Sequence, residues 1–203
     1  MTPQGVAVDS STIVYMADYN NYCIRKITSA GVVSTLAGSG TAGYKDATGT
    51  EAQFDRPTGV AVDSSGFLYV TDYSNRRIRE ITSEGVVSTI VGTVTAGAGV
   101  SGTEDTAAGP PAVVAKFSSP QGVTVFVSAN NRYVYVADTA NHLIRKITSA
   151  GKVTTLAGST RGYKEGAGTA ARFKAPTGVA VDSSGNVYVV DNRSNRIRKI
   201  EYK

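Results

Sequence analysis

Short apolar runs alternate with small polar clusters along the chain, and the alternation recurs four times. Each unit starts with Gly-Val-x-Val, passes through a cluster such as Asp9-Ser10-Ser11, and continues into further apolar runs of four or five residues. Asp/Ser/Gly clusters are typical of turns, and apolar runs of this length between turns predict β-strands. The expected strands are, by order in the unit, 5–8, 59–62, 122–125 and 178–181; 13–17, 67–71, 133–137 and 187–190; 24–27, 78–81, 144–147 and 197–200; and 32–36, 86–90 and 153–156.

The repetition predicts the architecture. Copies of the unit start at Pro3, Pro57, Pro120 and Pro176, and their second strands are apolar on both alternating faces, as in strands that are covered on both sides. A small sheet of this kind is stable only when it stacks on copies of itself. Radial stacking of four-stranded antiparallel sheets is the β-propeller, which we favour over a solenoid because solenoid repeats are usually shorter. We therefore predict an all-β propeller with three complete blades and one blade that lacks its outer strand.

We expect a single domain over 1–203, with blades at about 3–38, 57–92, 120–158 and 176–203 and long linkers at 39–56, 93–119 and 159–175. Only three residues follow the last predicted strand, too few for an outer strand. Three arrangements remain open: a fragment of a longer propeller, an unusual small closed ring, or an open arc completed by another chain. Because unpaired edges are normally covered, we favour completion by a protein partner or an identical chain.

The order of the motifs resembles the NHL repeat. The pattern Gly-Val-Ala-Val-Asp-Ser-Ser-Gly-x-Val-Tyr-Val followed by Asp-x-x-Asn-x-x-Ile-Arg-Lys-Ile runs through all four units, with Ser194 in place of the usual Asn. The third unit also departs from it, since it lacks the Asp after its first strand. The resemblance implies propeller blades that often serve as platforms for protein or RNA. It also implies a relation to propeller enzymes of lyase or lactone-hydrolase type, which place metal ligands around the central channel.

Composition argues against catalysis. The chain has one histidine, His142, and one cysteine, Cys23, whereas zinc sites use three or four N, S or O ligands. Two G-x-G-x-x-G strings, at 38–43 and 97–102, lack the strand–helix context that binds a dinucleotide. We therefore expect no catalytic residues, no metal and no cofactor. No apolar stretch reaches the ~18 residues of a membrane span, no signal peptide is expected, and the compartment is not indicated.

Residues that recur in every unit are expected to be structural. Each unit has an Asp that we expect to shape the turn after the second strand, and an Arg that we expect to form ladders or salt links between blades. Each linker ends in a Phe that we expect to anchor it in the propeller, and His142 is expected to be a turn residue. The recurring residues are Asp18, Asp72, Asp138 and Asp191; Arg25, Arg79, Arg145 and Arg198; and Phe54, Phe117 and Phe173.

Specific binding is expected where the copies differ, in the linkers and in the turns between second and third strands, which share one face of a propeller. The net charge is +5, and the linker 159–175 carries four basic residues against one acid, Glu165. We predict a non-catalytic interaction scaffold that binds a protein or another macromolecule through this face. One alternative is a fragment of a propeller enzyme of lyase or lactone-hydrolase type. The other is RNA binding through the basic third linker, because clustered Lys/Arg and an exposed ring suit phosphates and bases. The candidate binding residues are Tyr44, Lys45, Arg76, Arg161, Tyr163, Lys164, Arg172, Lys174 and Arg193.

Overall fold

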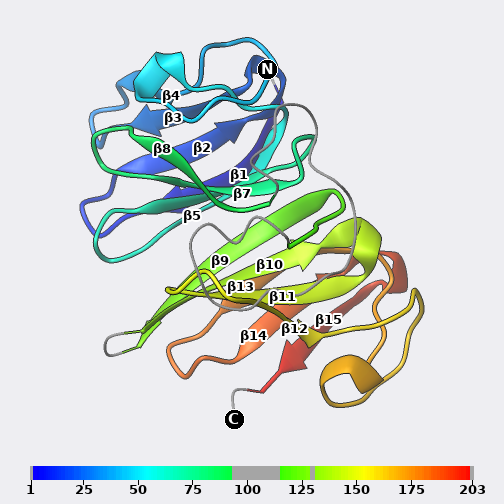
Figure 1. Cartoon of the computed structure of the whole chain (residues 1–203). Helices are drawn as coiled ribbons and strands as arrows, with labels where there is room; N and C mark the ends of the chain where they lie inside the picture. Colours follow the sequence, from blue (N-terminus) through cyan, green and yellow to red (C-terminus); the bar gives the residue numbers. More distant parts are fainter. Residues whose placement is uncertain (1, 93–114, 129–130, 202–203) are drawn as a thin grey trace.

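The computed structural model describes residues 2–92, 115–128 and 131–201, and within them it is an all-β protein with short 3-10 turns (Figure 1). No helix in these ranges has the length and apolar character needed to cross a membrane. The strands are β1 (Pro3–Val8), β2 (Val14–Asp18), β3 (Cys23–Ile27), β4 (Val33–Ala37), β5 (Pro57–Val62), β6 (Leu68–Asp72), β7 (Arg77–Ile81), β8 (Val87–Val91), β9 (Pro120–Ser128), β10 (Asn131–Asp138), β11 (Leu143–Thr148), β12 (Val153–Ala157), β13 (Pro176–Val181), β14 (Val187–Asp191) and β15 (Arg196–Ile200). The 3-10 turns are η1 (Tyr19–Asn21), η2 (Gly49–Glu51), η3 (Thr139–Asn141), η4 (Gly168–Ala170) and η5 (Asn192–Ser194).

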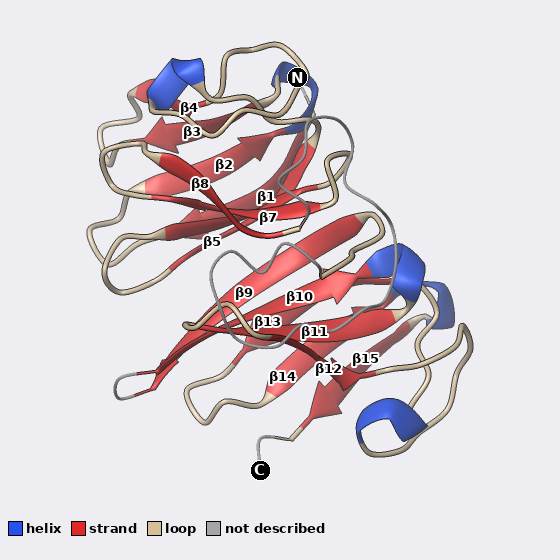
Figure 2. Cartoon of the chain, viewed as in Figure 1, coloured by secondary structure: helices blue, strands red, loops and turns tan. Residues whose placement is uncertain are grey.

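The strands form four antiparallel sheets in chain order, which are the blades of a β-propeller (Figure 2). Blades 1, 2 and 3 have four strands each, β1–β4, β5–β8 and β9–β12. Blade 4 has three, β13–β15, among the residues that the structure describes. The predicted fold class is confirmed, including the blade without an outer strand. The turns η2 and η4 lie in the linkers that precede blades 2 and 4.

The inner strands of successive blades lie so close that the motif needs its glycine. A Cβ on Gly5 would stand 2.5 Å from the carbonyl oxygen of Thr58, and one on Gly122 would stand 2.6 Å from that of Thr177. A side chain at either position would therefore push the inner strands of two blades apart. The equivalent Gly178 in blade 4 would meet only Val190 of its own blade.

Three hydrophobic clusters hold the blades together. Each cluster combines one face of a blade, the facing side of the next blade, and a buried Phe from the linker between them. The anchors Phe54, Phe117 and Phe173 are at most 1% exposed, which confirms their predicted structural role. The stacking explains why the second strands are apolar on both faces, since the sheets of blades 2 and 3 each contribute to two clusters.

The recurring Asp and Arg form an ion pair inside each blade rather than a link between blades, so the predicted inter-blade ladder is wrong; the pair is buried in blades 2, 3 and 4, whereas Arg25 of blade 1 is partly exposed. In blade 2 the Arg79 guanidinium donates to the Asp72 carboxylate at 2.7 Å, and both side chains are fully buried. Asp72 also accepts the backbone N–H of Asp55 (2.8 Å) and the Asn75 amide (2.9 Å). The Asp therefore ties the preceding linker and the turn to the third strand, a wider role than the predicted turn closure.

The equivalent pair in blade 3 shows how strongly the site is desolvated. Burial raises the pKa of the Asp138 carboxyl to about 6, although donors from Ser118, Asn141 and Arg145 act to lower it. A buried carboxylate of this kind is stable only with all its donors in place.

Removing one anchor tests the inter-blade clusters. Phe54→Ala is expected to lower the free energy of unfolding by about 3–5 kcal/mol, because it leaves a cavity between blades 1 and 2. Urea denaturation followed by circular dichroism measures the change. Val32, which is 61% exposed, is the control, and Val32→Ala is expected to change stability by no more than about 0.5 kcal/mol. Equal effects of the two substitutions would contradict the anchor role.

Candidate functional site

The linker between blades 3 and 4 and the turn η5 form a basic cleft on the face where linkers and turns meet. The cleft has a volume of about 490 Å³. Its lining residues, which define the basic cleft from here on, are Arg161, Gly162, Tyr163, Lys174, Arg193, Ser194 and Arg196.

Backbone bonds around the buried Asp of blade 4 set the shape of the cleft. The N–H of Lys174 donates to the Asp191 carboxylate at 2.7 Å, and the N–H of Arg193 donates to the carbonyl of Lys174 at 3.0 Å. These bonds clamp the linker to the turn, so that both present their cations to one space. The Arg196 guanidinium lies 4.1 Å from the centre of the Tyr163 ring, a cation–π contact that orders both side chains.

The charge of the cleft is not compensated. Within the described ranges no carboxylate pairs with Arg161, Lys174, Arg193 or Arg196. The nearby acid, Glu165, is engaged elsewhere, since it accepts from the Tyr163 hydroxyl at 2.8 Å and from Arg198 at 3.1 Å. Clustered cations without counter-charges create a field that attracts anionic groups.

His142 lies beside this field. It has a left-handed backbone (φ 62°), and its Nδ1 accepts the N–H of Ala175 at 3.1 Å, as suits the predicted turn residue. Burial lowers its pKa, and the nearby cation of Arg161 lowers it further, while Asp191 acts in the opposite direction. Burial and the cations of the cleft thus both disfavour the protonated imidazole.

Blade 2 provides an internal comparison, because the linkers Gly43–Pro57 and Gly162–Pro176 align residue by residue. In both linkers the residue after the Phe anchor donates its N–H to the buried Asp of the blade, Asp55 in one and Lys174 in the other. The positions of Arg161, Arg172, Lys174 and Arg193 are held in blade 2 by Ala42, Gln53, Asp55 and Ser74. Arg77 holds the place of Arg196 and packs on Tyr44 as Arg196 packs on Tyr163, so three of the four cations, Arg161, Lys174 and Arg193, are specific to blade 4.

The structure brings together four of the nine predicted binding residues, Arg161, Tyr163, Lys174 and Arg193, around this cleft. Arg196 joins them but was missing from the predicted set; its place directly after the turn was the available signal. Lys164 and Arg172 face each other in a short bridge next to the cleft, and both are exposed.

The other three predicted residues lie in the linker and turn of blade 2. The Tyr44 ring packs 3.6 Å from the Arg77 guanidinium, and its hydroxyl is 3.2 Å from that of Thr89. Lys45 pairs with Glu51 at 3.3 Å, and Arg76 takes the left-handed turn position (φ 55°). These contacts give Tyr44 structural partners in β7 and β8 and give Lys45 a partner in its own linker.

The part of the chain that the structure describes contains no group of three or more His, Cys, Asp and Glu placed to hold a metal ion. Cys23 is buried, and burial raises the pKa of its thiol, which disfavours the nucleophilic thiolate. The string at 38–43 lies in a loop, and the string at 97–102 lies outside the described residues. We find no constellation for catalysis in the described ranges.

Comparison with known proteins confirms the resemblance seen in the sequence. Residues 54–81 and 173–200 match the NHL repeat model. NHL repeat-containing protein 2 of Bos taurus is 29% identical over the whole of this chain, which corresponds to 31% of that protein. The chain spans less than a third of the length of the curated relatives it matches first.

Solved structures confirm the fold. An auxiliary nutrient binding protein from Bacteroides thetaiotaomicron superposes with a TM-score of 0.73 at 21% identity, over 98% of this chain and 47% of that one. Virginiamycin B lyase from Staphylococcus aureus gives a TM-score of 0.58 at 16% identity, over 99% of this chain and 56% of the lyase. At these identities the likeness shows the propeller fold alone.

The single histidine serves as a probe of the cleft. Arg161→Ala is expected to raise the pKa of His142, because it removes a cation that disfavours the imidazolium. An NMR titration of the imidazole C–H signals, which are unique in this chain, measures the shift. Lys45→Ala, in the linker of blade 2, is expected to leave the titration unchanged. An unchanged titration in the Arg161 variant would show that the field at His142 has another source.

Proposed function

We propose that this chain, which carries NHL repeats at 54–81 and 173–200, is a non-catalytic interaction scaffold that binds a protein partner through its linker-and-turn face. The observation that carries the proposal is the basic cleft of blade 4, whose four cations have no carboxylate partner within the described ranges. Blade 2 holds Ala42, Asp55 and Ser74 in the places of Arg161, Lys174 and Arg193, so folding does not account for these three charges. A site that is dispensable for the fold and keeps unpaired charge suits recognition of an anionic group.

An acidic protein segment suits the cleft better than RNA. Recognition of a single-stranded base needs a free aromatic face, whereas the Arg196 guanidinium already lies 4.1 Å from the Tyr163 ring centre. Arginine forks suit carboxylates, which they bind through paired hydrogen bonds. The lyase alternative has less support, since it rests on likeness of fold.

Charge reversal tests the cleft. Lys174→Glu combined with Arg193→Glu is expected to weaken binding of a peptide rich in Asp and Glu by about tenfold, since two attractive charges become repulsive. Fluorescence anisotropy with a labelled peptide measures the affinity, and the wild-type affinity is expected to fall as salt is raised.

The matched control reverses two exposed cations in the linker of blade 2, Lys45→Glu with Arg56→Glu, and is expected to keep wild-type affinity. An equal loss of peptide affinity in both double variants would show that the effect comes from the net charge of the protein and not from the basic cleft. A single-stranded RNA oligonucleotide that binds while the acidic peptide does not would replace the protein proposal with the RNA alternative.

The scaffold proposal includes a second chain that completes the ring, because the outward faces of blades 1 and 4 are uncovered copies of inter-blade surfaces. In blade 1, Val6 is 64% exposed and Val33 is 59% exposed, whereas the equivalent Val60 and Val87 are 5% and 2% exposed. In blade 4, Ile197 is 68% exposed, whereas the equivalent Ile24 is fully buried. Each chain thus carries both halves of a blade–blade contact.

We propose that a second copy of the chain covers these faces head to tail. The face of blade 4 around Ile197 would meet the face of blade 1 around Val6, as blade 1 meets blade 2 within the chain. Such an interface is heterologous, and it closes into a ring when the rotation allows. Exposed apolar surface of this kind supports association, since water contact is unfavourable for it.

Complementation tests the head-to-tail contact. Val6→Asp and Ile197→Asp are each expected to abolish the self-association that the wild-type chain shows, because each would bury a charge in the contact. An equimolar mixture of the two variants retains one intact pair of faces and is expected to form a 1:1 dimer. Analytical ultracentrifugation and native mass spectrometry with one variant mass-tagged measure these species.

Val127, which is 45% exposed in the hairpin of blade 3, provides the control, and Val127→Asp is expected to associate like the wild type. A wild-type chain that remains monomeric at every concentration would contradict the head-to-tail proposal. Association that survives both Asp variants would place the contact elsewhere.

A further inference from the structure

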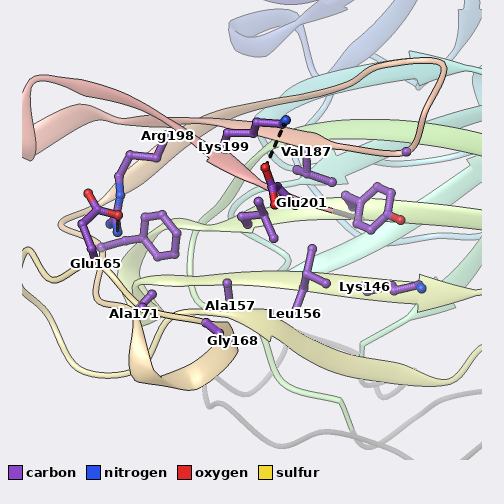
Figure 3. A pocket seen from close by; sticks show the side chains of 16 residues that line it. Lys146, Leu156, Ala157, Glu165, Gly168, Ala171, Val187, Arg198, Lys199 and Glu201 are labelled. Carbon is purple, nitrogen blue, oxygen red and sulfur yellow. Dashed lines mark hydrogen bonds and ion pairs between the residues drawn. The ribbon is translucent and has the colours of Figure 1, made fainter. Parts of the chain in front are cut away.

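Blade 4 has an apolar cleft beside its last strand, on the side that faces blade 3 (Figure 3). The cleft has a volume of about 550 Å³, and we call it the strand cleft. Leu156, Ala157 and Gly168 lie on one side, and Val187 and the strand β15 lie on the other (Figure 3). It is separate from the basic cleft, since none of the residues that line one lines the other.

The equivalent place in blade 2 is occupied by the outer strand β8. Val87 of β8 is 2% exposed in the cluster that contains Ala37, Phe54 and Leu68. The counterparts of these three residues, Ala157, Phe173 and Val187, all line the strand cleft. The strand cleft is therefore the seat of an outer strand that the described part of blade 4 does not provide.

The linker between blades 1 and 2 also binds β8 through its backbone. The Val87 N–H donates to the Ala47 carbonyl at 2.9 Å, and the Gly49 N–H donates to the Gly85 carbonyl at 2.8 Å. The N–H and the hydroxyl of Thr89 each donate to the Asp46 carboxylate at 3.1 Å. Beyond its pairing with β7, then, β8 is also held by the linker before blade 2, through Asp46, Ala47 and Gly49 and through the Tyr44 hydroxyl.

The linker between blades 3 and 4 has the same conformation. The Gly168 carbonyl accepts the N–H of Gly158 at 3.1 Å, as Gly49 accepts that of Gly38 at 3.0 Å. The N–H of Arg172 donates to Lys164 at 3.0 Å, the same distance as for Gln53 and Lys45.

The groups that would receive a strand are thus in place at the strand cleft. Glu165, Gly166 and Gly168, the counterparts of Asp46, Ala47 and Gly49, all line it. The Glu165 side chain is 70% exposed, whereas that of Asp46, beside β8, is 37% exposed.

We infer that the strand cleft binds an extended segment of a partner polypeptide, which adds to β15 as an antiparallel fourth strand. The inference rests on the proposed scaffold function, and it names the chemistry of a partner at a surface other than the basic cleft and the end faces. Strand addition to an open edge derives affinity from backbone hydrogen bonds and specificity from alternate side chains.

The three complete blades define the sequence that fits. Their outer strands read Val-Ser-Thr-Leu-Ala, Val-Ser-Thr-Ile-Val and Val-Thr-Thr-Leu-Ala, each preceded by a glycine two residues earlier. The glycine is required, because Gly85 has φ +84° and a Cβ there would stand 2.9 Å from the Leu36 carbonyl oxygen. The segment therefore needs a Gly, a β-branched apolar residue two positions later, and a Thr two positions after that. The N–H and hydroxyl of this Thr would donate to the Glu165 carboxylate, as those of Thr89 donate to Asp46.

The edge of β15 presents the matching backbone groups. In blade 1 the N–H of Thr28 donates to Val32 across the β3–β4 turn, so the N–H of Lys26, two residues earlier, also points toward β4. Lys199 holds the place of Lys26 in the repeat, and its N–H therefore points to the open edge of β15. A proline there would remove a donor that the blade itself does not use.

The test uses the intact chain and a fluorescent peptide with the sequence of residues 84–92, Glu-Gly-Val-Val-Ser-Thr-Ile-Val-Gly. Anisotropy is expected to show saturable binding with one site per chain. The peptide with Val87→Asp is expected to bind at least about tenfold more weakly, because the carboxylate would enter the apolar cleft. A scrambled peptide of the same composition is expected not to bind. Equal affinity of all three peptides would overturn the inference.

Two variants of the protein locate the binding edge. Lys199→Pro is expected to weaken binding of the peptide by at least about fivefold, because a backbone hydrogen bond is lost. Lys199→Ala is expected to bind the peptide like the wild type. Thermal unfolding checks that both variants are folded. If the proline variant does not fold, the comparison of the three peptides on the wild-type chain still tests the inference. Lys174→Glu with Arg193→Glu is expected to leave peptide affinity unchanged, so failure of the basic cleft and failure of the strand cleft are separate results. Peptide binding that ignores Lys199→Pro in the folded variant would place the site elsewhere.

Discussion

The buried Asp–Arg pair in blades 2, 3 and 4 is the interaction on which the placement of strand, turn and linker depends. A desolvated pair of charges is costly unless each remaining donor and acceptor is satisfied. In blade 2 the pair meets this condition by drawing on groups outside its own strands: Asp72 accepts the N–H of Asp55, and Arg79 donates to the carbonyls of Lys45 and Gln53, each at 3.0 Å. The long linker is thereby folded onto the blade that follows it.

Both candidate sites of blade 4 follow from this arrangement. Asp191 fixes the backbone at Lys174, and the carbonyls of Lys164 and Arg172 accept from Arg198. The same linker then exposes cations to the basic cleft on one side and backbone groups to the strand cleft on another. The proposed sites thus combine residues that differ between copies, such as Lys174 and Arg193, with a backbone that the recurring Asp–Arg pair holds in the same conformation.

Much of the fold was predictable, because the inner-strand glycines, the double-sided apolar strands and the Phe anchors each have one structural reading in a stacked sheet. The partner of each recurring Arg was not predictable, since regular spacing is equally consistent with bonds inside a blade and between blades. The basic residues of the third linker were visible in the sequence, yet the contact of Arg196 with Tyr163 depends on the folding of the linker. The strand cleft was not predictable either, because it is recognised only when the packing of Val87 in blade 2 is compared with the same place in blade 4.

The near identity of the outer strands has a consequence for folding. A segment such as Gly85–Val91 matches the seat beside β15 almost as well as its own seat in blade 2, so the chain holds several rivals for one vacancy. During folding, a strand that pairs one blade too far along the chain, or in a neighbouring molecule, forms many native-like contacts before the error is felt. The near identity of the outer strands therefore favours misassembly during refolding that grows with protein concentration, and an occupant of the strand cleft would remove one of the competing pairing sites.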